Sequence, residues 1–138
     1  METRNYKKFH RKGNIYKKEN IKQAIVKRGF YGLKVLEPGI ITPKELETAR
    51  RILTRLTKRT GKIFINVIFK HPLTKKPLLS RMGKGSGNIE SWISYVKKGK
   101  IIIEVKGISK EIAIIAFKAI QYRISVKVRI IEREIVDA

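Results

Sequence analysis

The chain has 138 residues, which is enough for one domain with a single hydrophobic core. Its 33 Lys and Arg residues outnumber the 11 Asp and Glu residues and leave a formal net charge of +22. Such an excess repels itself in a compact domain, so it indicates a polyanionic partner and favours nucleic acid over an anionic membrane. The longest apolar run, residues 112–117, is too short to cross a bilayer. We therefore expect no membrane span.

The first 28 residues are strongly cationic and show no sustained apolar period. Tyr6, Phe9, His10 and Tyr16 are interleaved with the cations, and such rings can stack on unpaired bases. We predict a basic N-terminal arm over residues 1–28 that orders on its partner. The alternative is a merely disordered tail.

Residues 29–42 predict a short strand followed by the Pro38-Gly39 turn. Thr42, Pro43 and Glu45 then mark the start of a helix, with Thr42 as N-cap and a Thr-x-x-Glu capping box. Gly61 is the expected stop. The expected inner face of this helix consists of Leu46, Ala49, Leu53 and Leu56.

Cations occupy much of the rest of this helix, and only Glu45 and Glu47 near its start oppose them. An apolar stripe with a cationic remainder packs on a core and exposes its basic side. We predict a binding face there, and a merely solvated face is the alternative. The residues of this candidate binding face are Arg50, Arg51, Arg55, Lys58 and Arg59.

Further strands and a second helix follow. Residues 62–70 predict a buried strand with Ile63, Ile65, Val67 and Phe69 on one face. Residues 70–91 read as an extended loop, because they lack a period and contain prolines and glycines. Residues 91–96 and 100–105 predict a hairpin. Ser109 is the expected N-cap of a second helix, and residues 125–131 alternate as a final strand with Val126, Val128 and Ile130 inward. The expected inner face of the second helix includes Ile112, Ile115, Ala116, Ala119 and Ile120.

These elements predict a two-layer α+β fold, in which two amphipathic helices form one layer and pack on a mixed or antiparallel sheet. Residues 29–138 would form this single domain, with residues 1–28 as its arm and residues 70–91 as its long glycine-rich loop.

The composition argues against catalysis. Asp137 is the only aspartate, the glutamates are scattered, and His10 and His71 have no ligand-like spacing. The glycines Gly83, Gly85 and Gly87 fit neither a Walker loop nor a dinucleotide fingerprint. We expect no catalytic residue, metal or cofactor.

Backbone without Cβ atoms can approach a phosphate chain closely, and cations flank these glycines. The loop therefore predicts contact with a nucleic acid. Its candidate residues are Lys75, Lys76, Arg81, Met82, Gly83, Lys84, Gly85, Ser86 and Gly87.

At this loop the sequence resembles a known family. "KKPLLSRMGKGSGNIESWISYVKKGKIIIEVKGIS", residues 75–109, is similar to the signature region of the bacterial-type large-subunit ribosomal protein sixteen family. "YGLKVLEPGIITPKELETARRILTRLTKRTGKIFINV", residues 31–67, resembles the turn, capped helix and strand of that family, and "YKKFHRKG", residues 6–13, its basic arm. The similarity covers residues 6–131. Ser86 stands where the family usually has lysine, and residues 14–28 match poorly.

The resemblance implies a hammerhead-type α+β domain bound to large-subunit rRNA beside the path of the A-site tRNA, with neighbouring ribosomal proteins nearby. It implies that the glycine loop reaches toward the peptidyl transferase region. It also implies that rRNA holds the arm through Lys7, Lys8, Phe9, His10, Arg11 and Lys12. We therefore expect a structural constituent of the large subunit that is neither an enzyme nor a homo-oligomer. A free-standing RNA-binding or RNA-chaperone protein is the alternative.

The skew toward Ile and Lys, together with the divergent segments, favours a mitochondrial member of the family. The expected location is then the mitochondrial matrix, and a plastid or the bacterial cytoplasm are the alternatives.

Overall fold

The computed structural model describes residues 25–83, 85 and 87–133 of the chain. Two antiparallel sheets and two helices make up this part of the protein. In chain order the elements are β1 (Tyr31–Val35), β2 (Gly39–Ile41), α1 (Pro43–Leu56), β3 (Lys62–Ile65), β4 (His71–Lys75), β5 (Asn88–Val96), β6 (Ile101–Lys106), α2 (Lys110–Gln121) and β7 (Val128–Glu132). The predicted α+β class is confirmed.

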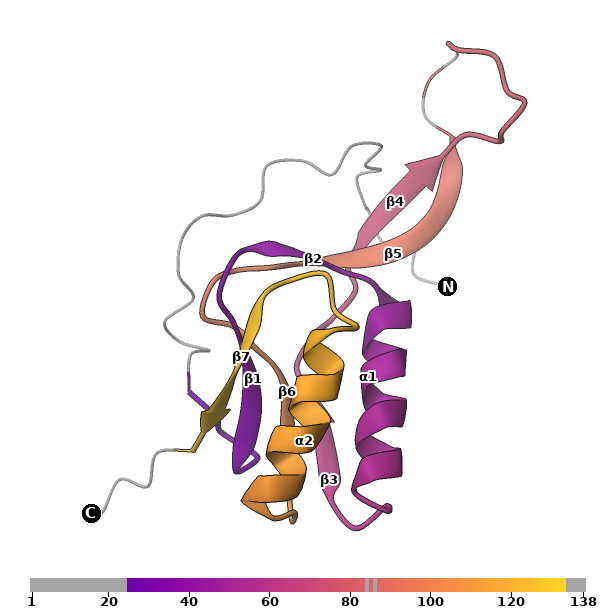
Figure 1. Cartoon of the computed structure of the whole chain (residues 1–138). Helices are drawn as coiled ribbons and strands as arrows, with labels where there is room; N and C mark the ends of the chain where they lie inside the picture. Colours follow the sequence, from indigo (N-terminus) through magenta and orange to yellow (C-terminus); the bar gives the residue numbers. More distant parts are fainter. Residues whose placement is uncertain (1–24, 84, 86, 134–138) are drawn as a thin grey trace, which may run out of the picture.

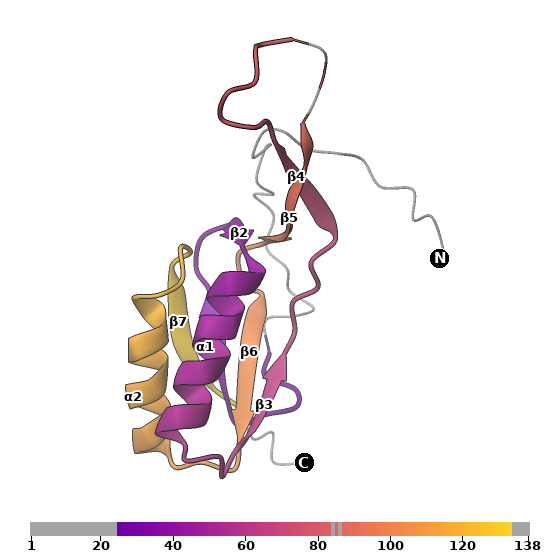
Figure 2. The same ribbon diagram turned by 90° about the vertical axis from the view of Figure 1, so that its right-hand side faces the viewer.

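The two sheets have different roles. The four-stranded sheet, in the order β3-β6-β1-β7, carries α1 and α2 side by side on one face (Figure 1). The three-stranded sheet, β2-β5-β4, extends from one end of the body that the helices and the four-stranded sheet form. Its β4–β5 hairpin projects well beyond the helices (Figure 2). The predicted single sheet is thus two, and the second sheet forms the projection.

The core lies between the helices and the four-stranded sheet. Leu53 from α1, Phe117 from α2 and Ile103 from β6 are fully buried there. Each large apolar side chain buried in this way stabilises the fold by roughly 1.5–3 kcal/mol. The body therefore holds its shape through one continuous apolar layer.

The predicted start of α1 is confirmed. The side chain of Thr42 accepts a hydrogen bond from the Glu45 backbone N–H at 3.4 Å, and Pro43 occupies the first turn. The Glu45 carboxylate accepts from the Ser125 hydroxyl at 3.3 Å, so it joins α1 to the segment before β7. Leu46, Ala49 and Leu53 are buried as expected, with Ile52 beside them, and Leu56 is partly buried against the core.

The predicted inner face of α2 is partly wrong. Ser109 caps the helix as expected, with its hydroxyl 3.4 Å from the Ile112 nitrogen. However, Ile112 and Ile115 are 39% and 60% exposed. Apolar residues occur on nearly every side of this helix, so periodicity alone does not determine which side faces the sheet. The buried residues are Ala113, Ala116, Phe117 and Ile120.

The predicted hairpin of residues 91–96 with 100–105 is wrong. β5 and β6 follow each other in sequence but belong to different sheets. The turn between them binds to β1 instead: the Gly99 N–H donates to the Val35 carbonyl at 2.8 Å, and the Val35 N–H donates to the Lys100 carbonyl at 2.8 Å. The chain crosses from one sheet to the other at this point.

The predicted loop over residues 70–91 contains the true partner of β5. β4 pairs with β5 in antiparallel register, with Pro72 opposite Trp92. Proline is tolerated because β4 is the edge strand of its sheet, where a missing N–H breaks no ladder. The loop proper is therefore shorter, covering residues 76–87.

The predicted strand over residues 62–70 ends early. β3 stops at Ile65, whose side chain is 39% exposed, whereas Val67 is buried. The Asn66 N–H donates to the Ile102 carbonyl at 3.0 Å, and beyond it the chain leads to β4. The final strand begins later than predicted, because β7 spans Val128–Glu132 and Val126 precedes it. The predicted inward side is confirmed, since Val126 and Val128 are buried and Ile130 packs partly buried against the core.

Candidate nucleic-acid interface

The β4–β5 hairpin presents the loop of residues 76–87 at the far end of the projection (Figures 1 and 2). Arg81 is exposed at this end. Three large apolar side chains beside it are almost fully exposed: Leu78 at 96%, Leu79 at 99% and Met82 at 96%. The loop thus combines a cation with apolar groups that the domain does not bury, and a partner surface can cover both.

The glycines of this loop serve two different purposes. Gly83 and Gly85 have φ angles of 108° and 83°, in the region that other residues rarely adopt, and both face open space. Gly87 lies at the base of the loop, where a Cβ atom would come within 2.6 Å of the Lys75 carbonyl carbon and 2.8 Å of the Lys76 nitrogen. Two glycines shape the tip, and one lets the two limbs approach each other.

The loop lysines have partners within the hairpin. Lys75 Nζ lies 3.8 Å from the Glu90 carboxylate on the facing strand. Lys76 Nζ donates to the Gly83 carbonyl at 2.5 Å across the loop. Both side chains retain donors for an external anion, since an ammonium group has three. Of the predicted loop residues, Lys84 and Ser86 lie outside the described part of the chain.

The basic face of α1 divides into a paired part and an unpaired part. Arg50 donates to the Glu47 carboxylate from Nε at 3.0 Å and from a guanidinium nitrogen at 2.5 Å, and Arg51 Nε lies 3.3 Å from the same group. Mainly because of the hydrogen bond from Arg50, the pKa of the Glu47 carboxyl is lowered from 4.5 to about 2. One carboxylate thus partly neutralises two arginines.

The unpaired part lies at the C-terminal end of α1. Arg55, Lys58 and Arg59 are exposed, and no ion pair joins them to an acid within the residues described. Lys58 and Arg59 have φ angles of 51° and 62°, so the turn after α1 uses two cations where glycine is the usual choice. Gly61, which was predicted to end this helix, lies beyond the turn. A Cβ atom at Gly61 would lie 3.0 Å from the Lys106 carbonyl oxygen, so glycine allows the close approach of β6.

The predicted arm is described only from Ile25 onward, so the candidates Lys7, Lys8, Phe9, His10, Arg11 and Lys12 lie outside the described residues. Where the arm reaches the domain, Val26 is buried and Arg28 stacks over the Phe64 ring at 5.3 Å.

Glu104 is a functional candidate that the sequence reasoning missed. The sequence shows only scattered glutamates and singles out none of them for a role, yet Glu104 is only 1% exposed. The available signal was its position within β6, between Ile103 and Val105 in an otherwise apolar run. A carboxylate in such a run must be either buried with partners or at a sheet edge.

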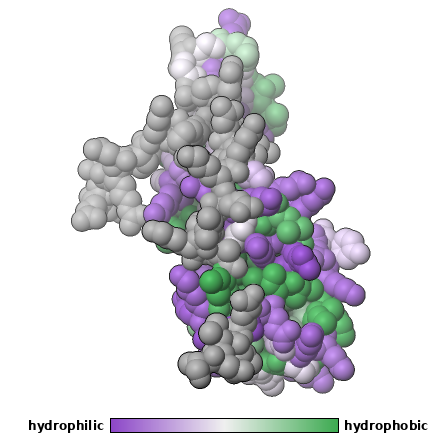
Figure 3. Space-filling view, turned by 90° about the vertical axis from the view of Figure 1, so that its left-hand side faces the viewer, coloured by the Kyte–Doolittle hydropathy of each residue, from purple (hydrophilic) through white to green (hydrophobic). Residues whose placement is uncertain are grey.

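The remaining surface is mixed. On the face that Figure 3 shows, hydrophilic and hydrophobic residues are interspersed over the body of the domain, and the projecting loop carries both kinds.

Among the described residues, no group of three or more His, Cys, Asp or Glu side chains could hold a metal ion. No helix in this part is long and apolar enough to cross a membrane.

These features define a class of protein: a strongly basic α+β domain with cationic surfaces and a projecting, glycine-rich hairpin loop. Comparison with known families identifies it further. Residues 1–131 match the family model described as ribosomal protein L16p/L10e, and the chain belongs to this family. Members of this family are structural ribosomal proteins rather than enzymes.

Two bacterial relatives illustrate the similarity. The chain is 48% identical over 99 residues to the large ribosomal subunit protein uL16 of Buchnera aphidicola subsp. Baizongia pistaciae. It is 46% identical over 99 residues to the protein of the same name from Buchnera aphidicola subsp. Cinara cedri. Each match covers 72% of this chain and 73% of the relative.

Proposed function

We propose that this protein is a structural constituent of the large ribosomal subunit and binds large-subunit rRNA near the A-site tRNA channel, with other ribosomal proteins as neighbours. The observation that carries the proposal is the projecting hairpin, which holds exposed Arg81 and exposed apolar side chains away from the body of a protein with a net charge of +22. Family membership and the names of the two relatives support the assignment to the large subunit.

The mechanism is charge neutralisation combined with shape. Each Lys or Arg that contacts a phosphate releases counterions, which supplies much of the affinity of a basic protein for RNA. Arg55 at the end of α1, with Lys58 and Arg59 in the turn after it, forms one contact surface, and the loop of residues 76–87 reaches a second region of the RNA. Residues 1–28 act as the rRNA-binding arm of the domain formed by residues 29–138.

The first test separates function from folding. Replacing Arg81 and Lys84 with Ala should impair subunit assembly or translation while leaving the melting temperature nearly unchanged, because Arg81 is exposed at the end of the loop. The matched control is Ile103→Ala on β6, which removes a fully buried side chain and should mainly lower stability. An equal loss of thermal stability in both variants would contradict the proposed role of the loop.

The second test distinguishes a resident subunit protein from a free-standing RNA-binding protein. We expect the chain to sediment with the large subunit through a high-salt wash and to leave that fraction only after RNase digestion. Release into light fractions at moderate salt would favour the alternative, an RNA-binding or RNA-chaperone protein.

The same fractionation tests the cellular compartment. The Ile and Lys skew supports our proposal of a mitochondrial ribosome, while the two relatives are bacterial proteins. Recovery of the chain in mitochondrial large subunits would support the proposal, and recovery in plastid or bacterial large subunits would replace it.

A further inference from the structure

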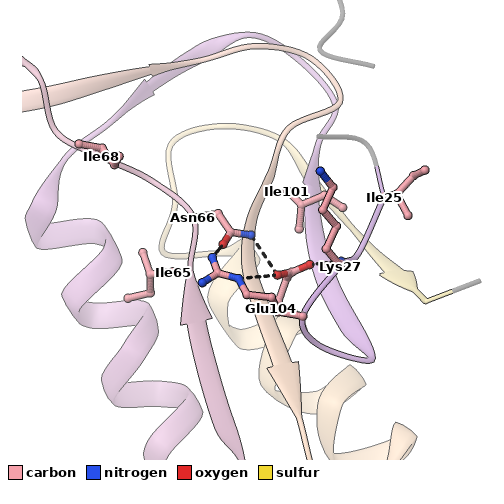
Figure 4. A pocket seen from close by; sticks show the side chains of 8 residues that line it. Ile25, Lys27, Ile65, Asn66, Ile68, Ile101 and Glu104 are labelled. Atoms are coloured by element: carbon pink, nitrogen blue, oxygen red, sulfur yellow. Dashed lines mark hydrogen bonds and ion pairs between the residues drawn. The ribbon is translucent and has the colours of Figure 1, made fainter. Parts of the chain in front are cut away.

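The Glu104 carboxylate is a buried negative charge in a strongly positive protein. It is 1% exposed, on the central strand β6, and an open hollow of about 320 Å³ lies beside it with Ile25, Ile65 and Ile68 among its walls (Figure 4). A buried charge is tolerated only when partners compensate it. The identity of these partners is the informative feature.

The first partners come from the end of the predicted arm. The backbone N–H of Lys27 donates to Glu104 Oε1 at 2.6 Å, and Arg28 Nε lies 3.8 Å from Oε2. The Arg28 guanidinium also stacks over the Phe64 ring. Glu104 therefore holds both the backbone and a side chain at the point where residues 1–24 join the domain.

The other partner comes from the segment that leads to the hairpin. The Asn66 side-chain amide donates to Glu104 Oε2 at 3.2 Å, and Arg28 in turn donates to the Asn66 side-chain oxygen. Asn66 directly follows β3, in the segment that connects this strand to β4. Figure 4 shows the side chains of Asn66 and Glu104 converging from the neighbouring segments.

We propose that Glu104 is a positioning residue that fixes the origins of both RNA-binding extensions, the N-terminal arm and the β4–β5 hairpin, relative to each other. The proposal rests on the proposed rRNA-binding function and deepens it. When both origins are fixed before binding, less conformational freedom is lost on the RNA, and the affinity is higher. Glu104 itself makes no contact with RNA in this role, since its carboxylate is buried.

The test is a double-mutant cycle in the full-length chain, with binding to a large-subunit rRNA fragment measured over a range of salt concentrations. Glu104→Gln keeps the shape of the side chain and removes its charge. We expect about tenfold weaker binding, the factor that corresponds to ~1.4 kcal/mol, with an unchanged salt slope because no phosphate contact is lost. In a chain with Lys7, Lys8, Arg11 and Lys12 replaced by Ala, the same substitution should have a clearly smaller effect.

A structural readout accompanies the binding data. In Glu104→Gln, hydrogen exchange should accelerate at the Lys27 backbone N–H and at the Asn66 side-chain amide, the two groups that donate to the carboxylate. Ile103→Val, a mild core change on the same strand, should leave both groups protected. Asn66→Ala provides a second variant in case Glu104→Gln folds poorly. It leaves the carboxylate paired with Lys27 and Arg28. Because Asn66 belongs to the segment that leads to the hairpin, its cycle uses the loop variant Arg81→Ala, and Asn66→Ala should weaken RNA binding less in that variant than in the unchanged chain.

The outcomes separate the two proposals. Additive effects of Glu104→Gln and the arm substitutions, or unchanged exchange at Lys27, would overturn the positioning role. Full RNA affinity in the arm variant alone would contradict the proposed function of the arm, and the exchange rates at Lys27 and Asn66 would then still decide whether Glu104 fixes the two origins.

Discussion

At the scale of single residues, the turn after α1 departs most clearly from the usual chemistry. Lys58 and Arg59 both adopt left-handed backbone conformations, which cost a residue with a Cβ atom about 1–2 kcal/mol. The surrounding contacts hold this turn in place: the Arg59 N–H donates to the Thr54 carbonyl at 3.2 Å, and the buried Thr57 hydroxyl donates to the Leu53 carbonyl at 2.7 Å. Strain retained at two exposed cations is typical of a functional site.

Replacing Arg59 with Gly should therefore change stability and binding in opposite directions. The substitution relieves the left-handed strain, so the free energy of unfolding should rise by roughly 0.5–1 kcal/mol. It also removes one exposed cation, so the affinity for rRNA should fall. Denaturant unfolding and RNA titration measure the two quantities. Arg55→Ala is the control, because it removes a helical cation without relieving strain; a stability gain there as well would contradict the explanation.

At the scale of secondary-structure elements, local signals were sufficient for the helix starts and insufficient for strand pairing. Thr42 and Ser109 were predicted as N-caps and are N-caps, because capping depends only on a few neighbouring residues. The pairing of β5 with β4 was not predicted. Pro72 made residues 71–75 look like loop, although proline is allowed in an edge strand, and the short turn before β6 resembled a hairpin connection. Pairing depends on contacts between distant segments, which the periodicity of one segment does not encode.

The same limit applies to the candidate site. Arg81 was predicted from the glycines that it flanks, and the basic residues of α1 and of the turn after it from their position around an apolar stripe. These side chains are exposed in the structure, and their contact with RNA stays a prediction. The buried position of Glu104 depends on where Lys27, Arg28 and Asn66 lie in three dimensions. No pattern within one segment reports that arrangement.

The orientation of α2 yields a prediction at this scale. Phe117→Ala should lower the free energy of unfolding by about 3–5 kcal/mol, because the ring is fully buried and its removal leaves a cavity. Ile115→Ala on the outer side should change it by no more than about 0.5 kcal/mol, since the side chain is 60% exposed. Urea unfolding of both variants tests the orientation, and a larger loss for Ile115→Ala would contradict it.

At the scale of the whole molecule, excess positive charge acts against the compact fold. Lys100 illustrates the local effect: burial, and in second place the charge of Lys70, lowers the pKa of its ammonium group. The net charge of +22 extends this repulsion over the surface. Binding of the proposed anionic partner would relieve the repulsion, so the stability of the fold and the proposed binding surface depend on the same charges.

Salt should consequently stabilise the free protein and weaken its complex with RNA. Raising the ionic strength from about 0.02 M to about 0.5 M shortens the screening length severalfold and reduces the self-repulsion. We expect the melting temperature of the free chain to increase over this range while its affinity for rRNA falls. Calorimetry and binding titrations in the same buffers test both effects. A melting temperature that decreases with added salt would show that repulsion is not a significant cost.

The length of β5, nine residues, places the loop far from the base of the hairpin. At ~3.3 Å per residue the strand extends about 30 Å, so a tilt of about 5° at its base would displace the far end by roughly 2–3 Å. A small tilt of the hairpin at its base is therefore magnified at the loop, where the proposed contact with RNA lies. The stiffness of the chain at the base of the hairpin therefore determines how accurately the loop is positioned. Substitutions near that base can displace the loop without changing any residue in it.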